Sequence, residues 1–280
     1  MLNEPPPVAM SISEFDPSGQ SGIIADIKTF AAHNCYGVAV VTALTLPQPG
    51  GKPKLHTTPS EWIKESILLL VREQNVRAIK IGMMCGRASA EAVCEVLDAN
   101  PSIAVVVDPD LRGMDDAAGS DPAAPEIVRS LLVRRATVVT PNASEASALA
   151  GIEVRSPAEM KSAAAKLVEM GARAAVVTGG AFERPFDVYY DQEFSETLAG
   201  ERFKVEAPFG PGSTFASAIA ANLAHGRQPH DAVVMAKAYV TEAIRKGYAT
   251  PSGTVVLNHF YRIHQAPRVI EAESGVPEPA

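Results

Sequence analysis

Residues 8–45 read VAMSISEFDPSGQSGIIADIKTFAAHNCYGVAVVTALT, in which two apolar runs flank an amphipathic segment. The runs VAMSIS (8–13) and YGVAVVTALT (36–45) are typical of buried strands. Over 22–34, large apolar residues follow helical spacing: Ile23, Ile24, Ile27 and Phe30. A strand, a helix and a second strand in this order predict a βαβ unit with parallel strands.

The same alternation continues along the chain. Helices are expected over 60–72 and 89–99, and further apolar strands over four ranges: 77–84, 103–108, 136–141 and 172–180. Because strands covered by helices on both faces are apolar throughout, the pattern predicts a three-layer α/β fold with a mainly parallel central sheet flanked by helices.

The last third of the chain departs from this alternation. Segments 182–191 and 196–207 are interrupted by charges and predict an antiparallel edge hairpin, with Ala199 and Gly200 between its strands. Two final helices are expected over 213–225 and 230–247. We expect one domain over residues 1–262, and a mobile tail over 263–280, which is rich in Pro and Glu.

Composition narrows the class of protein. The 280 residues are 46% hydrophobic and 20% charged with a formal net charge of -7, typical of a soluble globular protein and unlike a general nucleic-acid binder. The apolar runs fall short of the roughly 20 residues that span a bilayer. The first ten residues, MLNEPPPVAM, lack the pattern of a secretory leader, so we expect a cytoplasmic protein without membrane or nucleic-acid partners.

The segment FGPGST (209–214) is the sharpest local motif. In open parallel sheets, ligands bind beyond the carboxyl ends of the strands, where helix amino termini converge. Gly210 and Gly212 allow a tight turn before an apolar helix, which predicts free amides that could bind a phosphate. The alternative is a plain helix start with Ser213 or Thr214 as the N-cap, and the motif alone leaves both open.

Carboxylates follow two other predicted strands. Asn142 and Glu145 lie three residues apart in TPNASE (140–145), where they could hold a hydrated Mg²⁺ or form a capping box. Asp108 ends the strand IAVVVD and is either a metal partner or the cap of the next turn. Three further residues have purely structural interpretations. Met83 is expected in the apolar core, Lys80 either at the surface or beside a buried partner, and Asp26 as a solvent-facing acid near a helix amino terminus.

Taken in order, these motifs resemble those of the hydroxymethylpyrimidine and phosphomethylpyrimidine kinases of the ribokinase superfamily. The strongest segment is DPSGQSGIIADIKT (16–29), which is similar to the family's DPSGGAGIQADLKT. Further matching motifs follow in the family's order over residues 8 to about 262: KIGMM (80–84), DPDL (108–111), TPNASEA (140–146), the glycine pair 179–180, GPGST (210–214) and GTVVLNHF (253–260).

The resemblance implies a ribokinase-like homodimer that uses ATP and Mg²⁺ to phosphorylate a hydroxymethyl aminopyrimidine and then its monophosphate, in thiamin precursor synthesis. It implies that Asp26 and Met83 line the pyrimidine pocket. It also implies that Asp108 and Glu145 place Mg²⁺ with Asn142 beside them. Gly210 and Gly212 would form the anion hole that stabilises the moving phosphoryl group, and Thr178 and Gly180 would face the nucleotide.

The chain departs from the family's pattern at several of these positions. Ser213 stands where the family has a Cys thought to activate the substrate hydroxyl, and a serine hydroxyl is a weak base near neutral pH. Pro211 removes one backbone NH from the anion hole, and Thr178 replaces a lysine. Pro47 stands at the position of a pyrimidine-binding Gln, and Glu14 replaces a small residue before DPSG.

Three functions are therefore weighed. The first is the thiamin-pyrimidine kinase, in which positioning and Mg²⁺ carry catalysis and Ser213 orients the hydroxyl. The second is a catalytically silent pyrimidine- or nucleotide-binding protein, which the combined departures favour. The third is a sugar or pyridoxal kinase of the same fold, which the absence of an Asp at position 213 disfavours.

Overall fold

A computed structural model describes residues 4–46, 53–111, 123–203, 210–251 and 253–263. In this part of the chain the main sheet has nine strands in the order β3-β2-β1-β4-β5-β6-β7-β8-β9. The strands are β1 Val8–Phe15, β2 Tyr36–Leu46, β3 Lys54–Thr57, β4 Val76–Ile81, β5 Ala104–Val107, β6 Val138–Val139, β7 Ala174–Thr178, β8 Phe186–Asp191 and β9 Ser195–Ala199.

The centre of the sheet is parallel and its edges are antiparallel. Strands β2, β1, β4, β5, β6 and β7 pair in parallel, whereas β3 pairs antiparallel with β2, and β8 with both β7 and β9. Only the central strands need crossover helices, which the alternating segments of the sequence supply. The predicted three-layer fold with an antiparallel edge hairpin is confirmed.

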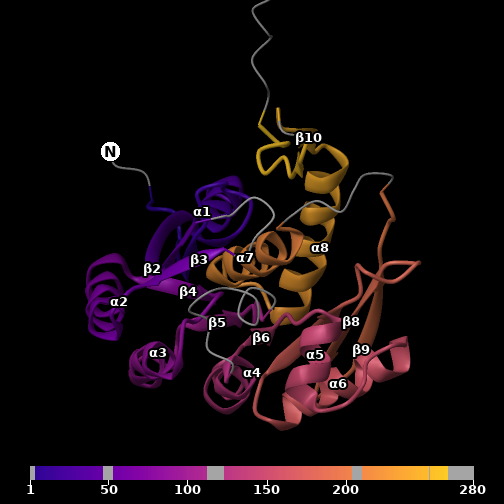
Figure 1. Cartoon of the computed structure of the whole chain (residues 1–280), viewed down its shortest axis with the longest axis horizontal. Coiled ribbons are helices and arrows are strands. Elements are labelled where there is room, and N and C mark those ends of the chain that lie inside the picture. Colours follow the sequence, from indigo (N-terminus) through magenta and orange to yellow (C-terminus); the bar gives the residue numbers. More distant parts are fainter. Residues whose placement is uncertain (1–3, 47–52, 112–122, 204–209, 252, 264–280) are drawn as a thin grey trace, which may run out of the picture.

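Helices cover both faces of the sheet, as Figure 1 shows. One layer contains α1 Gly22–Ala32, α7 Pro211–Ala224 and α8 Pro229–Arg245. The other contains α2 Ser60–Gln74, α3 Arg87–Ala99, α4 Ala124–Ile127 with the short turns Val128–Leu132 and Val133–Arg135, α5 Ala143–Ala150 and α6 Pro157–Glu169. A small antiparallel pair, β10 Tyr248–Ala249 and β11 Val255–Val256, follows α8.

Helix α7 is the innermost helix of the first layer. It contacts α1, β4 and β5 on one side and α8 on the other, and every residue from Ser213 to Ala224 is buried. Its sequence is rich in Ala, so neighbouring backbones can approach closely. This packing fixes the amino terminus of α7 at the end of the central strands.

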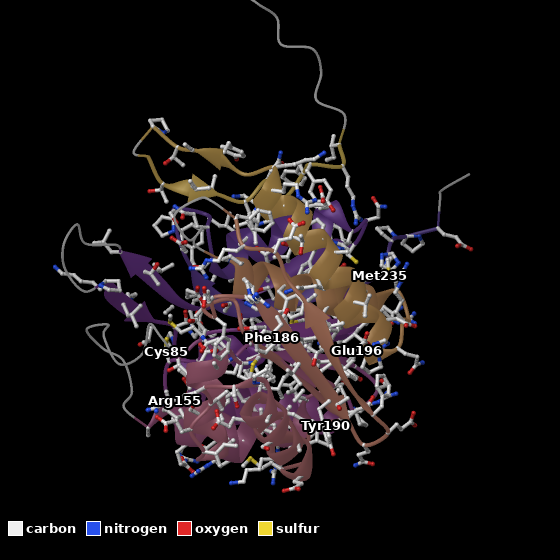
Figure 2. All side chains as sticks on the ribbon, turned by 90° about the vertical axis from the view of Figure 1, so that its right-hand side faces the viewer. Cys85, Arg155, Phe186, Tyr190, Glu196 and Met235 are labelled. Atoms are coloured by element: carbon white, nitrogen blue, oxygen red, sulfur yellow. The ribbon has the colours of Figure 1, made fainter. Side chains whose placement is uncertain are left out.

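The edge hairpin turns at a different place from the one expected. The turn lies between Asp191 and Ser195, because the Asp191 carboxylate accepts the amides of Glu193 (2.8 Å) and Phe194 (3.0 Å). Ala199 ends β9 instead of joining two strands. Figure 2 looks onto this edge, where Phe186, Tyr190 and Glu196 are labelled.

Some expectations fall outside the described residues. These are Pro47, Phe209 and the tail from residue 264 onward. Strand β3 and helix α6 were not anticipated, and the strand expected over 136–141 pairs only through Val138–Val139. Within the described residues, no helix is long and apolar enough to span a membrane.

Candidate active site

Several of the predicted site residues gather where β1, β4 and β5 end and α7 begins. Gly210 is the N-cap of α7, with a φ of 90° that favours glycine. A Cβ at Gly210 would lie 1.8 Å from the carbonyl oxygen of Gln20, so glycine is also required to let the two loops touch. The alternative of Ser213 or Thr214 as the N-cap is wrong, because both lie inside the first turn.

The first turn of α7 presents its amides at the sheet's carboxyl edge. Pro211 opens the helix, where its missing NH leaves no intrahelical bond unmade, and the Thr214 amide donates to Gly210 (3.1 Å). As in any α-helix, the amides of Gly212 and Ser213 have no intrahelical acceptor. The bend therefore offers two donors and the positive end of the helix dipole to an anion.

The hydroxyl of Ser213 is held by two charged side chains. It accepts a hydrogen bond from Lys80 Nζ (2.9 Å) and donates one to Asp26 Oδ1 (2.9 Å). A hydroxyl has one hydrogen and two acceptor lone pairs, so one lone pair remains for a ligand. Ser213 is 9% exposed, and its orientation is fixed by this network.

Asp26 is the centre of the network and is fully buried. Its carboxylate accepts hydrogen bonds from serine hydroxyls on two elements besides Ser213: Ser11 of β1 (2.6 Å) and Ser217 of α7 (2.5 Å). The interpretation of Asp26 as a solvent-facing acid is therefore wrong, because α7 packs over this face of α1. Whether a pyrimidine contacts Asp26 stays a prediction.

Lys80 is the buried cation that joins the site together. Its Nζ lies 3.2 Å from Asp26 and 3.6 Å from Asp108, and only 1% of its side chain is exposed. Burial alone lowers the pKa of Lys80, but these carboxylates hold that pKa above its ordinary value. The side chain of Lys80 therefore contacts both Ser213, beside the glycine bend, and Asp108.

Asp108, Asn142 and Glu145 form the acidic side of the site. The capping box is confirmed: the Glu145 amide donates to Asn142 (3.0 Å), and the Asn142 amide donates to Glu145 Oε2 (2.9 Å). Glu145 Oε1 also accepts the amide of Leu111 (3.3 Å), which ties α5 to the turn after β5.

Like charges crowd Asp108. Burial raises the pKa of its carboxyl to about 8, against the attraction of Lys80, and Asp110 and Glu145 raise it further. A divalent cation would relieve this repulsion, and carboxylate oxygens are its preferred ligands. The chemistry of the Asp108 and Glu145 carboxylates therefore fits Mg²⁺, although the described residues contain no group of three His, Cys, Asp or Glu side chains placed to hold a metal ion.

A second group of polar residues lies at the same edge of the sheet, around the end of β7. The amide of Gly179 donates to Asp187 (3.2 Å), whose other oxygen accepts from Lys237 of α8 (2.7 Å). Thr178 bridges to Asn142, and Gly180 has open space where a Cβ would lie. Sequence reasoning did not nominate Asp187 or Lys237, which lie 50 positions apart.

A cavity of about 350 Å³ lies beside this second group, between β9 and α8. Its lining includes Leu198, Val234 and Lys237. Ala199, which also lines it, pairs with Phe186 at the start of β8.

Glu14 is the second-last residue of β1 and is 2% exposed. Its carboxyl accepts hydrogen bonds from Ser13 (2.5 Å) and Ser21 (3.3 Å). Met83 is also buried, within the larger apolar core, and its carbonyl accepts the hydroxyl of Thr42 (2.8 Å). The structure thus supports the core interpretation of Met83 and leaves its contact with a pyrimidine as a prediction.

The chain is similar to a known family of proteins. The model of the phosphomethylpyrimidine kinase family matches residues 16–258. A hydroxymethylpyrimidine/phosphomethylpyrimidine kinase of Synechococcus elongatus is 32% identical over 91% of this chain and 98% of its own.

Solved structures of related kinases have the same fold as this chain. A Staphylococcus aureus pyridoxal kinase in complex with AMP-PCP and pyridoxal is 29% identical, with a TM-score of 0.82 over 91% of this chain and 94% of that chain. A phosphomethylpyrimidine kinase of Clostridium difficile is 29% identical, with a TM-score of 0.75 over 85% of this chain and 99% of that chain. This chain therefore belongs to the phosphomethylpyrimidine kinase family and is a phosphotransferase of the ribokinase fold.

Proposed function

We propose that this chain phosphorylates hydroxymethylpyrimidine, or its monophosphate, with ATP and Mg²⁺ in thiamin precursor synthesis. The observation that carries the proposal is the Ser213 hydroxyl, held by Lys80 and Asp26 at the glycine-capped start of α7. Its free lone pair can accept the hydrogen bond of a substrate hydroxyl. The names of the relatives supply the substrate class.

Each residue then has a role in the transfer. Ser213 orients the substrate hydroxyl, whose oxygen bonds to the γ-phosphorus as the bond from that phosphorus to ADP breaks; the proton of the hydroxyl is released to solvent. The amides of Gly212 and Ser213 stabilise charge on the moving phosphoryl group. Mg²⁺ bound by Asp108 and Glu145 would neutralise charge on the nucleotide phosphates.

The nucleotide is proposed to bind over the ends of β6 and β7. The supporting observations are the open space at Gly180, Lys237 and the adjacent cavity. The Staphylococcus aureus relative was solved with AMP-PCP, an ATP analogue. Lys237 supplies a positive charge near the end of β7, where the side chain of Thr178 is uncharged.

Turnover assays test this proposal. Purified protein with ATP and Mg²⁺ is expected to release ADP when hydroxymethylpyrimidine is added, and omission of Mg²⁺ is expected to stop the release. Thermal stabilisation by these ligands without ADP release would instead favour the silent binding protein.

Variants of Ser213 test its role. Because Ser213 orients the hydroxyl but is a weak base, Ser213→Cys is expected to raise kcat, and Ser213→Ala is expected to lower it by less than about 100-fold. The matched control is Ser217→Ala, which removes a hydroxyl from the same Asp26 oxygen one turn deeper in α7. A loss of 100-fold or more in Ser213→Ala alone would make the hydroxyl a direct participant, since removal of a general base typically costs about 10²–10⁴-fold.

A pyridoxal kinase is the second candidate. Pyridoxal also carries a hydroxymethyl group on a heteroaromatic ring, and the Staphylococcus aureus relative was solved with pyridoxal bound. Direct competition assays separate the two candidates. A higher kcat/KM for pyridoxal than for hydroxymethylpyrimidine would favour this second function.

A further inference from the structure

Glu14 is fixed in place at the end of β1. Besides its bonds from Ser13 and Ser21, it packs against Gly22, where a Cβ would lie 2.7 Å from Glu14 Oε1. Gly22 has a φ of 58° and is the first residue of α1. Because only glycine leaves this space, the carboxyl has a built pocket and cannot swing far from the edge of the sheet.

The position of Glu14 in the sheet assigns it to one half of the site. We call the ends of β1 and β4 the substrate half, and the ends of β6 and β7 the nucleotide half. Strand β5 lies between them. A Cβ on Gly82, just after β4, would lie 2.2 Å from Ser13 Oγ and 2.8 Å from Lys80 Nζ. Glu14 is thus adjacent to the Lys80 network that orients Ser213.

The charges that face Glu14 are mostly negative. Burial and the nearby Asp110 raise the pKa of Glu14 to about 7, and Lys80 opposes this rise. Glu14 and Asp110 in turn raise the pKa of the Cys85 thiol, after burial, to about 11. On the adjoining loop, Asp16 accepts from the Ser18 hydroxyl and the Ser21 amide, and Lys28 donates to the carbonyl of Gly19 (2.9 Å).

Lys80 has little positive charge to spare for a ligand. Its single positive charge is shared between two carboxyl groups, those of Asp26 and Asp108. Among the described residues, the substrate half therefore has an excess of negative charge. A phosphate monoester carries about two negative charges near neutral pH, and like charges brought together at a binding site cost several kcal/mol.

We propose that Glu14 makes this enzyme select an unphosphorylated hydroxymethyl heteroaromatic compound and exclude its monophosphate. This inference rests on the proposed function and narrows it to the first of the two phosphorylations. An uncharged ring with amino or ring NH groups can donate a hydrogen bond to Glu14. The monophosphate would bring about two further negative charges into the half of the site where that carboxylate lies.

The test compares kcat/KM for hydroxymethylpyrimidine and for its monophosphate at pH 8.5, where the Glu14 carboxyl is ionised. The native enzyme is expected to prefer the unphosphorylated compound by roughly 100-fold, the ratio that a few kcal/mol of repulsion gives. Glu14→Gln keeps the shape of the side chain and removes its charge. It is expected to raise kcat/KM for the monophosphate, relative to kcat/KM for hydroxymethylpyrimidine, at least about tenfold, because the repulsion is lost.

Two further variants keep the test decisive. Glu14→Gly places a small residue at this position and checks the result if Glu14→Gln folds poorly. Glu95→Gln removes an exposed carboxylate of α3 and is expected to leave the selectivity unchanged.

The outcomes separate this inference from the function on which it rests. Equal use of both substrates by the native enzyme, or equal changes for both in Glu14→Gln, would overturn the inference and leave the kinase function standing. Turnover of neither compound would overturn both.

Discussion

Replacement of Lys80 by Met tests the buried network on which the site depends. The change removes the only cation whose contacts with Asp26 and Asp108 are described, and both carboxylates are almost fully buried. Met has a similar length and fills the same space with an apolar chain. Two buried carboxylates and the Ser213 hydroxyl then lose the donor that offsets their desolvation.

The expected cost is large compared with the stability of a typical domain. Removal of one partner of a buried ion pair costs about 3–5 kcal/mol, out of a total of about 5–15 kcal/mol. In a protein of this size, 1 kcal/mol lowers Tm by about 2–4 °C, so Lys80→Met is expected to lower Tm by about 6–20 °C. Urea denaturation monitored by circular dichroism measures the free energy of unfolding.

Two further variants isolate the ion pair as the cause. Lys64→Met removes an exposed cation paired with Glu95, where both side chains are largely solvated, and is expected to cost only about 0–1 kcal/mol. The double variant Lys80→Met with Asp26→Asn removes both charges. It is expected to recover about 2 kcal/mol relative to the sum of the single changes, because the partners interact directly.

Strict additivity of the two single changes would refute the network, as would a cost for Lys80→Met no greater than that for Lys64→Met. Either result would mean that Lys80 does not hold Asp26 and Ser213 in place.

Two other changes test the packing around α7. Gly210→Ala is expected to cost at least about 2 kcal/mol of stability, because its Cβ would meet the Gln20 carbonyl oxygen at 1.8 Å. The control is Gly226→Ala: Gly226 has a φ of 83° and open space around it, so this change measures the backbone strain alone, at about 1 kcal/mol. Equal losses of stability in urea denaturation for the two variants would contradict the clash. His259 accepts or donates a hydrogen bond with Thr214, and burial lowers its pKa to about 4 from 6.5. As the pH falls below 6.5, His259 takes up a proton in the unfolded chain but not in the folded chain until about pH 4, so the folded state loses at most on the order of 3 kcal/mol of stability between these pH values. His259→Gln is expected to reduce this loss. An unchanged pH profile of unfolding in the variant would exclude the histidine as its cause.

Local sequence patterns determined the fold class and most elements. The apolar runs that became β1, β2, β4, β5 and β7 were visible because strands buried on both faces contain few polar residues. Strand β3, Lys54–Thr57, carries no such run, since it lies at an edge and is mostly exposed. The edge hairpin was recognised, but its turn depends on the Asp191 carboxylate capping two amides, which strand patterns do not reveal.

The site was predictable only as a set of loops. Asn142 and Glu145 could be assigned to a capping box because the motif is local, and the structure confirms it. The placement of Asp26 was wrong because its burial depends on Ser213 and Ser217, which follow it by 187 and 191 positions. Lys80 lies within the apolar run of β4, and a lysine in such a run indicates that a buried carboxylate pairs with it.

By itself, the sequence determined the alternating strands and helices, the glycine bend before α7 and the family, because each depends on neighbouring residues or on their order. Only the tertiary structure decided that Lys80 joins Asp26, Asp108 and Ser213, and that Glu14 is buried beside them. Parallel strands bring their carboxyl ends to one edge whatever their separation along the chain. The charges that meet there are set by packing between distant segments, which no local pattern records.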